Sequence, residues 1–307
     1  MRAFRNRLVL YLTTTVVITL FIPASTLACA CGCNVFSVGA RWMMATSAGL
    51  RMFLTYDYMD QYDNWSAWNG ASSYMNEDKI IRSGFYTLGL QYMANRDWGV
   101  MVEAPVWDRY LMTTTESGSL ASTDHISVAD VRVLGMYTGI SEDMSTAVQF
   151  GLKLPTGPYN LSLLDRDTQI GTGTTDLLLG GYQMGQENDW GWFAQAMWQH
   201  AFNSRDGYRP GDSFDMTLGV HYDNLLETYK VVPILQLIAS FRGSDSGVNA
   251  DPANTGYERL YVSPSVEVNV SPNVQLYGDV RIPLLTHVTG YQLVAPALFE
   301  VTLGYQM

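Results

Sequence analysis

The chain has 307 residues, a formal net charge of −11, 15% charged side chains and 12% aromatic ones. Soluble domains usually carry about 25% charged residues, so this composition is poor in charge for a soluble domain. The acidic balance disfavours nucleic acid as a partner. A mean hydropathy of −0.01 argues against a helical membrane protein, whereas a membrane β-barrel alternates its lipid-facing residues with polar ones.

The N-terminus has the pattern of a secretory leader. Arg2, Arg5 and Arg7 form a basic region, and an apolar stretch at 8–22 precedes small residues. The apolar run is shorter than the roughly 18 residues of a membrane-spanning helix, and three threonines interrupt it. We therefore expect a signal peptide at 1–28, a periplasmic segment that contains the cysteines at 29–47, and a single β-barrel domain at 48–307. The apolar, irregular part of the second segment, 34–47, is compatible with either a periplasmic or a lumenal position.

All three cysteines lie in one short run, Cys29-Ala30-Cys31-Gly32-Cys33. Alternate residues of an extended chain share one face, so three thiolates could converge on a soft metal such as Cu(I) or Zn. The run lacks the spacing of a haem-attachment or Cys₄ zinc motif. Three alternatives stay open: a local disulfide that leaves one thiol over, a lipidated Cys29, and a bond to a periplasmic metal or redox partner.

Twelve stretches of the domain show the period-two alternation of β-strands. They are 48–61, 83–94, 98–112, 126–138, 145–154, 176–185, 191–202, 213–223, 228–241, 257–270, 274–287 and 290–307.

The connections between these stretches alternate in length. Short turns are expected at 95–97, 139–144, 186–189, 224–227 and 271–273, and long polar loops near 62–82, 113–125, 155–175, 203–212 and 242–256. The last connection, 287–290, is shorter than the other loops. Short periplasmic turns and long extracellular loops are typical of outer-membrane barrels. We therefore predict an all-β fold, a single antiparallel transmembrane barrel of about 12 strands in the outer membrane of a Gram-negative bacterium, with both chain ends periplasmic.

The last stretch, 291–307, has an apolar register that begins at Tyr291 and Leu293 and reaches Leu303 and Tyr305. An apolar face rimmed by aromatic residues suits a strand that meets lipid. A chain that ends on such a strand resembles the closing strand of bacterial outer-membrane barrels, which the barrel-assembly machinery recognises. The alternative, an edge strand of a soluble β-sandwich, would expose a long apolar edge to aggregation. Membrane lipid and the assembly machinery are therefore expected partners.

Several aromatic residues fall near the expected short turns, where a periplasmic aromatic girdle would lie. They are Trp98, Tyr137, Trp190, Trp192, Tyr229 and Tyr305.

The other register of the strands carries charged residues of both signs, which we expect to line the lumen. These are Glu103, Arg109, Asp130, Arg132, Lys153, Asp215, Arg259, Glu267, Asp279, Arg281 and Glu300. Counting back from the loop centres places Arg109 roughly opposite Asp130. Such pairs suit a polar lumen, or they fill a narrow interior as salt bridges. We favour a pore or gated lumen, because twelve strands lie between side-chain-filled eight-stranded barrels and open sixteen-stranded porins.

Three motifs follow one another in the middle of the chain: DVRV at 130–133, GLKLPTG at 151–157 and GTGTTD at 171–176. With them, the region 127–185 resembles the outer-membrane transporter-like family of the MetA pathway of phenol degradation. The resemblance implies a barrel that moves small, often apolar, compounds across the outer membrane. It implies no catalytic residues.

The sequence therefore predicts a channel or transporter for passive passage of small solutes, either apolar or aromatic compounds or cations. The alternative is a structural or docking barrel whose cysteine cluster binds a soft metal or a periplasmic redox partner. We expect no enzymatic activity and assign no catalytic residue, because His125, His200, His221 and His287 lie in no recognisable nucleophile motif.

Overall fold

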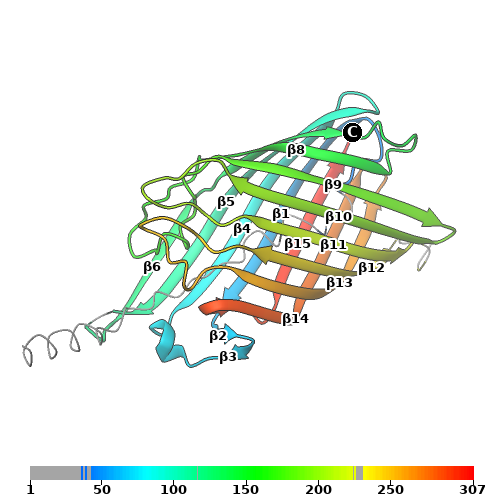
Figure 1. Cartoon of the computed structure of the whole chain (residues 1–307). Helices are drawn as coiled ribbons and strands as arrows, with labels where there is room; N and C mark the ends of the chain where they lie inside the picture. Colours follow the sequence, from blue (N-terminus) through cyan, green and yellow to red (C-terminus); the bar gives the residue numbers. More distant parts are fainter. Residues whose placement is uncertain (1–35, 37–38, 40–42, 116, 224, 226–230) are drawn as a thin grey trace, which may run out of the picture.

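The computed structural model describes residues 36, 39, 43–115, 117–223, 225 and 231–307. Within these residues the chain forms one antiparallel sheet that closes on itself as a tilted barrel (Figure 1). The wall consists of β1 (Gly49–Gln61), β4 (Ile80–Met93), β5 (Trp98–Thr114), β6 (Leu120–Val128), β7 (Val131–Tyr137), β8 (Thr146–Leu154), β9 (Asp176–Glu187), β10 (Trp190–Ala201), β11 (Ser213–Tyr222), β12 (Val231–Arg242), β13 (Tyr257–Ser271), β14 (Val274–Val294) and β15 (Leu298–Gln306).

The sheet closes because β15 pairs with β1 along nine residues. β6 and β7 both pair with β5, one after the other, so they form a single wall strand. The predicted antiparallel barrel of twelve strands is therefore confirmed. Closure pairs the backbone of every wall strand with two neighbours, as a segment surrounded by lipid requires.

Period-two alternation sorts the side chains between the lumen and the outer surface. Leu54 lies opposite Leu88 on β4 and Leu303 on β15, and each of the three is about half exposed on the outside. The alternate residues of β1, from Phe53 to Gln61, are buried inside. The outer face thus presents the apolar belt that lipid requires.

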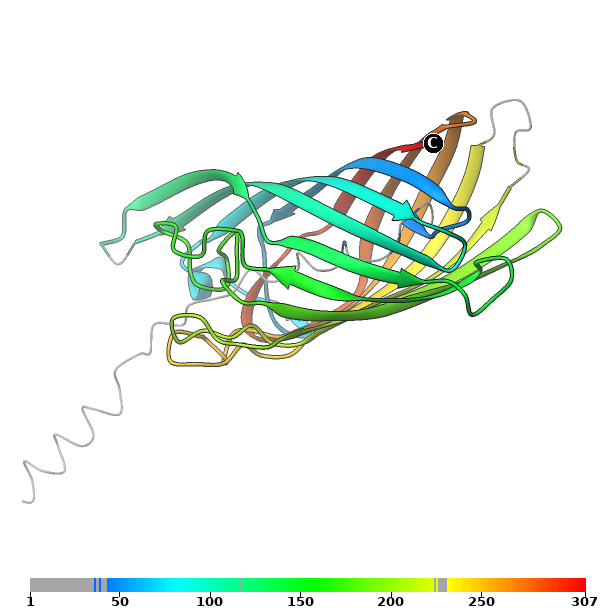
Figure 2. The same cartoon turned by 90° about the horizontal axis from the view of Figure 1, so that it is seen from above.

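The two ends of the barrel differ in their loops. The last residue, Met307, donates its backbone N–H to the carbonyl of Leu50, so the C-terminus and the start of β1 share one end (Figure 1). Trp98, Trp190 and Tyr305 are exposed at this end. Trp192 is likewise exposed, Tyr137 packs against Trp98, and Tyr229 lies outside the described residues. The long loops gather at the opposite end, as Figure 2 also shows.

The last hairpin differs from the prediction. β14 continues to Val294, so the turn lies at 295–297 instead of 287–290. The end of β14 pairs above the rim with β2 (Asp63–Ala67), which in turn pairs with β3 (Asn69–Gly70). Leu293 is fully buried there, so the exposed apolar register begins at Phe299 and not at Tyr291.

Another difference concerns the second predicted loop, 113–125. Its residues mostly extend the hairpin of β5 and β6, which pair up to Thr114 and Leu120. A short 3₁₀ helix, Ser73–Asn76, follows β3. No helix in the described part of the chain is long and apolar enough to cross a membrane.

Candidate functional site

The lumen contains part of the chain that precedes β1. Gly39 donates its N–H to the Gln195 side chain on β10 (3.3 Å). Ala45 exchanges two hydrogen bonds with the Tyr182 hydroxyl of β9, at 3.0 and 3.2 Å. The described residues 36, 39 and 43–47 therefore lie in the lumen, one of the two positions that the sequence leaves open for 34–47. Cys29, Cys31 and Cys33, like the expected signal peptide, lie outside the described residues.

Two further contacts fix this segment against the wall. Arg51 on β1 donates a hydrogen bond of 2.6 Å to the carbonyl of Met44, and Gln91 on β4 donates one of 3.0 Å to the carbonyl of Met43. Phe36 lies further along the lumen, with its ring 5.7 Å from that of Phe85. The described residues of this segment therefore lie between the inner wall near Arg51 and the ring of Phe85.

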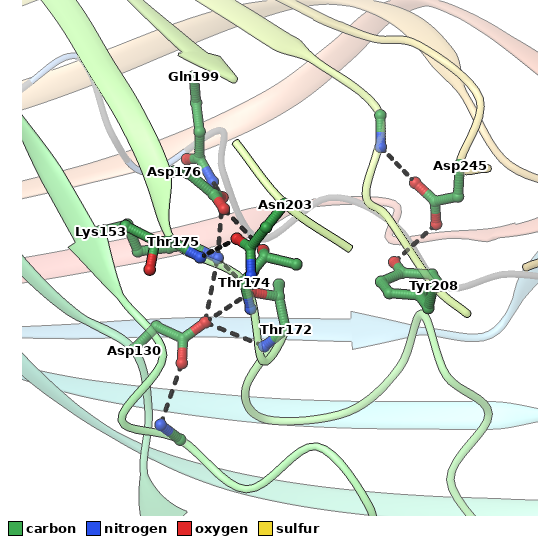
Figure 3. A network of polar contacts seen from close by, with 12 residues as sticks. Asp130, Lys153, Thr172, Thr174, Thr175, Asp176, Gln199, Asn203, Tyr208 and Asp245 are labelled. Atoms are coloured by element: carbon green, nitrogen blue, oxygen red, sulfur yellow. Dashed lines mark hydrogen bonds and ion pairs between the residues drawn. The ribbon is translucent and has the colours of Figure 1, made fainter. Parts of the chain in front are cut away.

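A bulge in the wall turns Asp130 inward. Residues 129–131 face only residues 104–105 of β5, because the register moves from Val106–Val128 to Glu103–Arg132. Extra residues of this kind redirect side chains in many sheets. The Asp130 carboxylate then accepts hydrogen bonds from the N–H groups of Gly157 (3.0 Å) and Thr172 (2.9 Å). It thereby joins the two ends of the long loop 155–175 (Figure 3).

Lys153 extends this network along the wall. Its ammonium lies 3.0 Å from Asp130 and 2.9 Å from Asp176. Asp176 also accepts hydrogen bonds from Thr174 (2.6 Å) and Gln199 (2.5 Å). The three motifs thus meet in one buried cluster, defined here as the Asp130 network, which holds the loop 155–175 to β8 and β9 (Figure 3).

The loop 155–175 folds over the lumen. Leu161 and Leu164 belong to an apolar cluster with Leu293, Ile81 and Leu111 from β14, β4 and β5. The fully buried Arg109 donates hydrogen bonds to the loop carbonyls of Thr168 and Gln169.

The expected position of Arg109 opposite Asp130 is wrong. Its register partner is His125, because β6 begins earlier than the sequence indicated.

A cavity of about 150 Å³ lies between this loop, the N-terminal segment and the wall. Aromatic residues line one side, chiefly Phe36, Phe85 and Trp107. The charged residues that line it are Asp57, Glu103, Arg109, Asp130, Arg132, Lys153, Arg166, Asp167, Arg242 and Glu300. The cavity therefore offers charges of both signs beside apolar rings.

All eleven charged residues proposed for the lumen are buried or partly buried within the barrel. Glu103, Arg109, Asp130, Arg132, Lys153 and Glu300 line the cavity, and Asp215, Arg259, Glu267, Asp279 and Arg281 do not. Arg281 lies between Asp279 (3.1 Å) and Glu300 (2.5 Å). On β11, three strands away from β14, Asp215 accepts a hydrogen bond from Ser240 (2.5 Å). The structure thus contains salt bridges and a cavity in the same lumen.

At the outer end of the cavity, the guanidinium group of an arginine lies against two aromatic rings. Arg166 lies between the rings of Tyr159 and Tyr208, at 5.0 and 4.4 Å from their centres. Beside it is Asp167, whose Oδ2 atom is shielded from solvent without a hydrogen-bond partner among the described residues. Burial, and then the nearby charges of Asp165 and Asp245, raise the pKa of the Asp167 carboxyl to about 7.

Sequence reasoning missed several residues of this site. Asp57 belongs to the inward-facing register of β1, so the alternation along this strand could have predicted its position in the lumen. Thr172 and Asp176 belong to the third motif, but they do not alternate with apolar residues as the predicted lumen residues do. Phe36 and Asp167 lie outside the strands and had no local signal. In the described residues, no group of three or more His, Cys, Asp or Glu side chains is placed to hold a metal ion.

No family model and no curated protein matches the chain. Among solved structures, the COG4313 outer membrane channel from Pseudomonas putida F1 is similar, with 13% identity and a TM-score of 0.67 over 88% of this chain and 100% of the other. The β domain of the Bordetella autotransporter BrkA is also similar, with 13% identity and a TM-score of 0.52 over 85% and 100% of the two chains. At such identities the similarity concerns the fold alone, and that fold is the closed barrel of Gram-negative outer-membrane proteins.

Proposed function

We propose that the chain is an outer-membrane channel through which small solutes pass, and that the two segments in its lumen restrict the passage. The cavity inside the closed barrel is the observation that carries this proposal. It is bounded by the loop 155–175 and by the N-terminal segment, which contact the inner wall through hydrogen bonds and apolar packing and are not strands of the sheet. Movement of either segment would widen the lumen.

The size and lining of the cavity limit the solutes. A cavity of about 150 Å³ in another protein binds benzene, so a compound with one ring fits this volume. Apolar rings and charged groups line the same space. We therefore propose small aromatic or cationic compounds as the solutes.

The Asp130 network also supports kinship with the transporter-like family of the MetA pathway. Its members come from all three motifs on which that resemblance depends. Kinship of this kind agrees with passive transport of small, often apolar, compounds.

The test is conductance in planar bilayers together with solute uptake into liposomes. The refolded protein should run as a heat-modifiable barrel and should raise both ion current and uptake of a one-ring solute above those of empty liposomes. Heat-denatured protein is the control. A folded barrel that gives neither current nor uptake would overturn the channel in favour of a structural or docking barrel.

A further inference from the structure

A row of acidic and aromatic side chains crosses one wall of the cavity. Asp57 on β1 lies opposite Glu300 on β15 and, on its other side, opposite Phe85 on β4. Phe85 in turn lies opposite Trp107 on β5. Register partners in an antiparallel sheet present their side chains on the same face, and all four line the cavity. Asp57 and Trp107 are two strand spacings apart, roughly 10 Å. One small molecule can therefore contact both.

One carboxylate of this row, that of Asp57, has an oxygen without a hydrogen-bond partner among the described residues. Asp57 is only 4% exposed, and its Oδ1 atom accepts no hydrogen bond from the described residues. The carboxylate of its neighbour Glu300 already forms a salt bridge with Arg281. A buried carboxylate oxygen without a hydrogen-bond donor is costly, so a ligand that brings a positively charged donor would be stabilised here.

Three of the five basic residues that line the cavity are engaged with other groups of the protein. Lys153 lies between Asp130 and Asp176, and Arg132 lies 4.0 Å from Glu103. Arg109 is bound to loop carbonyls. The Asp57 end of the cavity therefore has an unpaired acceptor and no unpaired donor among these groups.

The rings beside Asp57 already attract cations within the protein. The Arg109 guanidinium lies 4.9 Å from the centre of the Trp107 ring, and the Arg281 guanidinium lies 4.9 Å from that of Phe36. Phe85 contacts Trp107 edge to face, with 4.9 Å between ring centres. Aromatic faces near a carboxylate are a common recognition site for organic cations.

We infer that Asp57, Phe85 and Trp107 form a binding site for a small aromatic amine in its protonated form. The ammonium group lies against Asp57, and the ring packs on Phe85 and Trp107. The inference rests on the proposed channel and names the solute class that its cavity selects.

The outer end of the cavity has features that would instead favour binding of an anion. Arg166 and Arg242 have side-chain N–H groups that find no acceptor within the described structure. These donors would favour an anion. The experiment therefore compares a cation, a neutral compound and an anion of similar size.

The probes are benzylammonium, benzyl alcohol and benzoate at pH 7, and binding to the folded protein in detergent is measured by equilibrium dialysis. Benzylammonium should bind about tenfold or more tightly than benzyl alcohol, as a desolvated cation on aromatic faces and a carboxylate would give. Benzoate should bind more weakly than benzylammonium. Equal binding of the three probes, or preference for benzoate, would overturn the inference.

Matched variants locate the site. Asp57→Asn keeps the side-chain size and should reduce benzylammonium affinity about tenfold without changing benzyl alcohol affinity. Trp107→Leu should weaken binding of both, and Trp107→Phe should restore part of it. Asp215→Asn is the control, because Asp215 is an acidic residue of the lumen that does not line the cavity. An equal loss in Asp57→Asn and Asp215→Asn would assign the effect to general lumen charge and refute the site.

The two proposals fail in different ways. If the folded wild type conducts ions and takes up solutes but binds the three probes alike, only the amine site is refuted. If no folded variant conducts ions or admits any probe to liposomes, the channel itself is refuted.

Discussion

At the scale of single residues, Asp130 connects the wall to the loop that covers the lumen. Its two carboxylate oxygens receive two backbone N–H groups from opposite ends of the loop 155–175 and the ammonium of Lys153. Hydrogen bonds to a buried charged group contribute more to stability than those between neutral groups. The position of the loop therefore depends strongly on this one side chain.

Asp130→Ala should release the loop. Each lost hydrogen bond to the carboxylate contributes roughly 1.5–3 kcal/mol, so the loop should open far more often. Limited trypsin digestion followed by mass spectrometry should show faster cleavage after Arg166, which lies in the loop. Asp143→Ala, in the exposed turn 138–145, is the control and should not change this rate. An unchanged rate in Asp130→Ala would mean that the other contacts of the loop, those of Arg109, Leu161 and Leu164, hold it without Asp130.

Asp167 should make the loop sensitive to pH. Its pKa is raised to about 7 by burial first and then by Asp165 and Asp245. A raised pKa in the folded state means that the closed loop is favoured at low pH and loses that advantage as the pH rises from about 4 to 7. Planar-bilayer current should therefore increase between pH 5 and pH 8.

The Asp167→Asn variant should lose part of that increase. Asp143→Asn should keep it, because hydrogen bonds from the hydroxyl and backbone N–H of Ser145 lower the pKa of Asp143. Equal pH dependence in the wild type and Asp167→Asn would show that other groups control the current.

At the scale of elements, the segment before β1 is held by polar contacts to the inner wall. Tyr182 alone exchanges two hydrogen bonds with Ala45, and Arg51 binds the carbonyl of Met44. The apolar cluster around Met44 and Ala45 adds contacts with inward side chains of several strands. The segment is thus an attached element of the lumen and not part of the wall.

Tyr182→Phe should loosen this element without disturbing the barrel. The loss of two hydrogen bonds costs about 1–3 kcal/mol, so single-channel recordings should show larger or more frequent openings. Tyr92→Phe, on the exposed outer face of β4, is the matched control. Unchanged recordings for Tyr182→Phe would mean that the segment does not restrict the passage.

At the scale of the whole molecule, the barrel depends on an outer surface that faces lipid. Leu54, Leu88 and Leu303 form a continuous apolar stripe across three adjacent strands. The stripe lies outside, while charged residues such as Asp57 lie inside on the same strands. The same alternation therefore serves the membrane and the lumen at once.

Leu54→Arg should destabilise the barrel by about 2–4 kcal/mol, the effect of an arginine on the lipid face near the membrane centre. Urea unfolding in lipid vesicles measures the change. Tyr62→Arg, just beyond β1 and 48% exposed, should unfold like the wild type. Equal stability of both variants would contradict the assignment of this face to lipid.

The role of the cysteine cluster stays a prediction, because Cys29, Cys31 and Cys33 lie outside the described residues. We expect it to bind a soft metal or a periplasmic partner separately from barrel assembly. The triple Cys→Ser variant should still form a heat-modifiable barrel but lose the bound metal or partner. Purified protein that holds no metal and carries only an acylated Cys29 would show that the cluster is a lipid anchor.

The sequence alone determined the strand number, the antiparallel barrel and the outward register of Leu303 and Tyr305 on β15. These features follow from period-two alternation, which is local, because successive side chains of any strand point to opposite faces. The inward position of Glu103, Lys153 and Glu300 follows from the same local rule.

The tertiary structure decided what these residues meet. Asp130 binds Lys153 and the loop 155–175 because a bulge turns it inward. Arg109 meets loop carbonyls because the loop 155–175 folds over the lumen. The turn at 295–297 and the segment inside the lumen depend on contacts with β2, β9 and β10. Contacts of this kind join residues far apart in the chain, and their partners are fixed only when the sheet closes and sets the register of every strand at once.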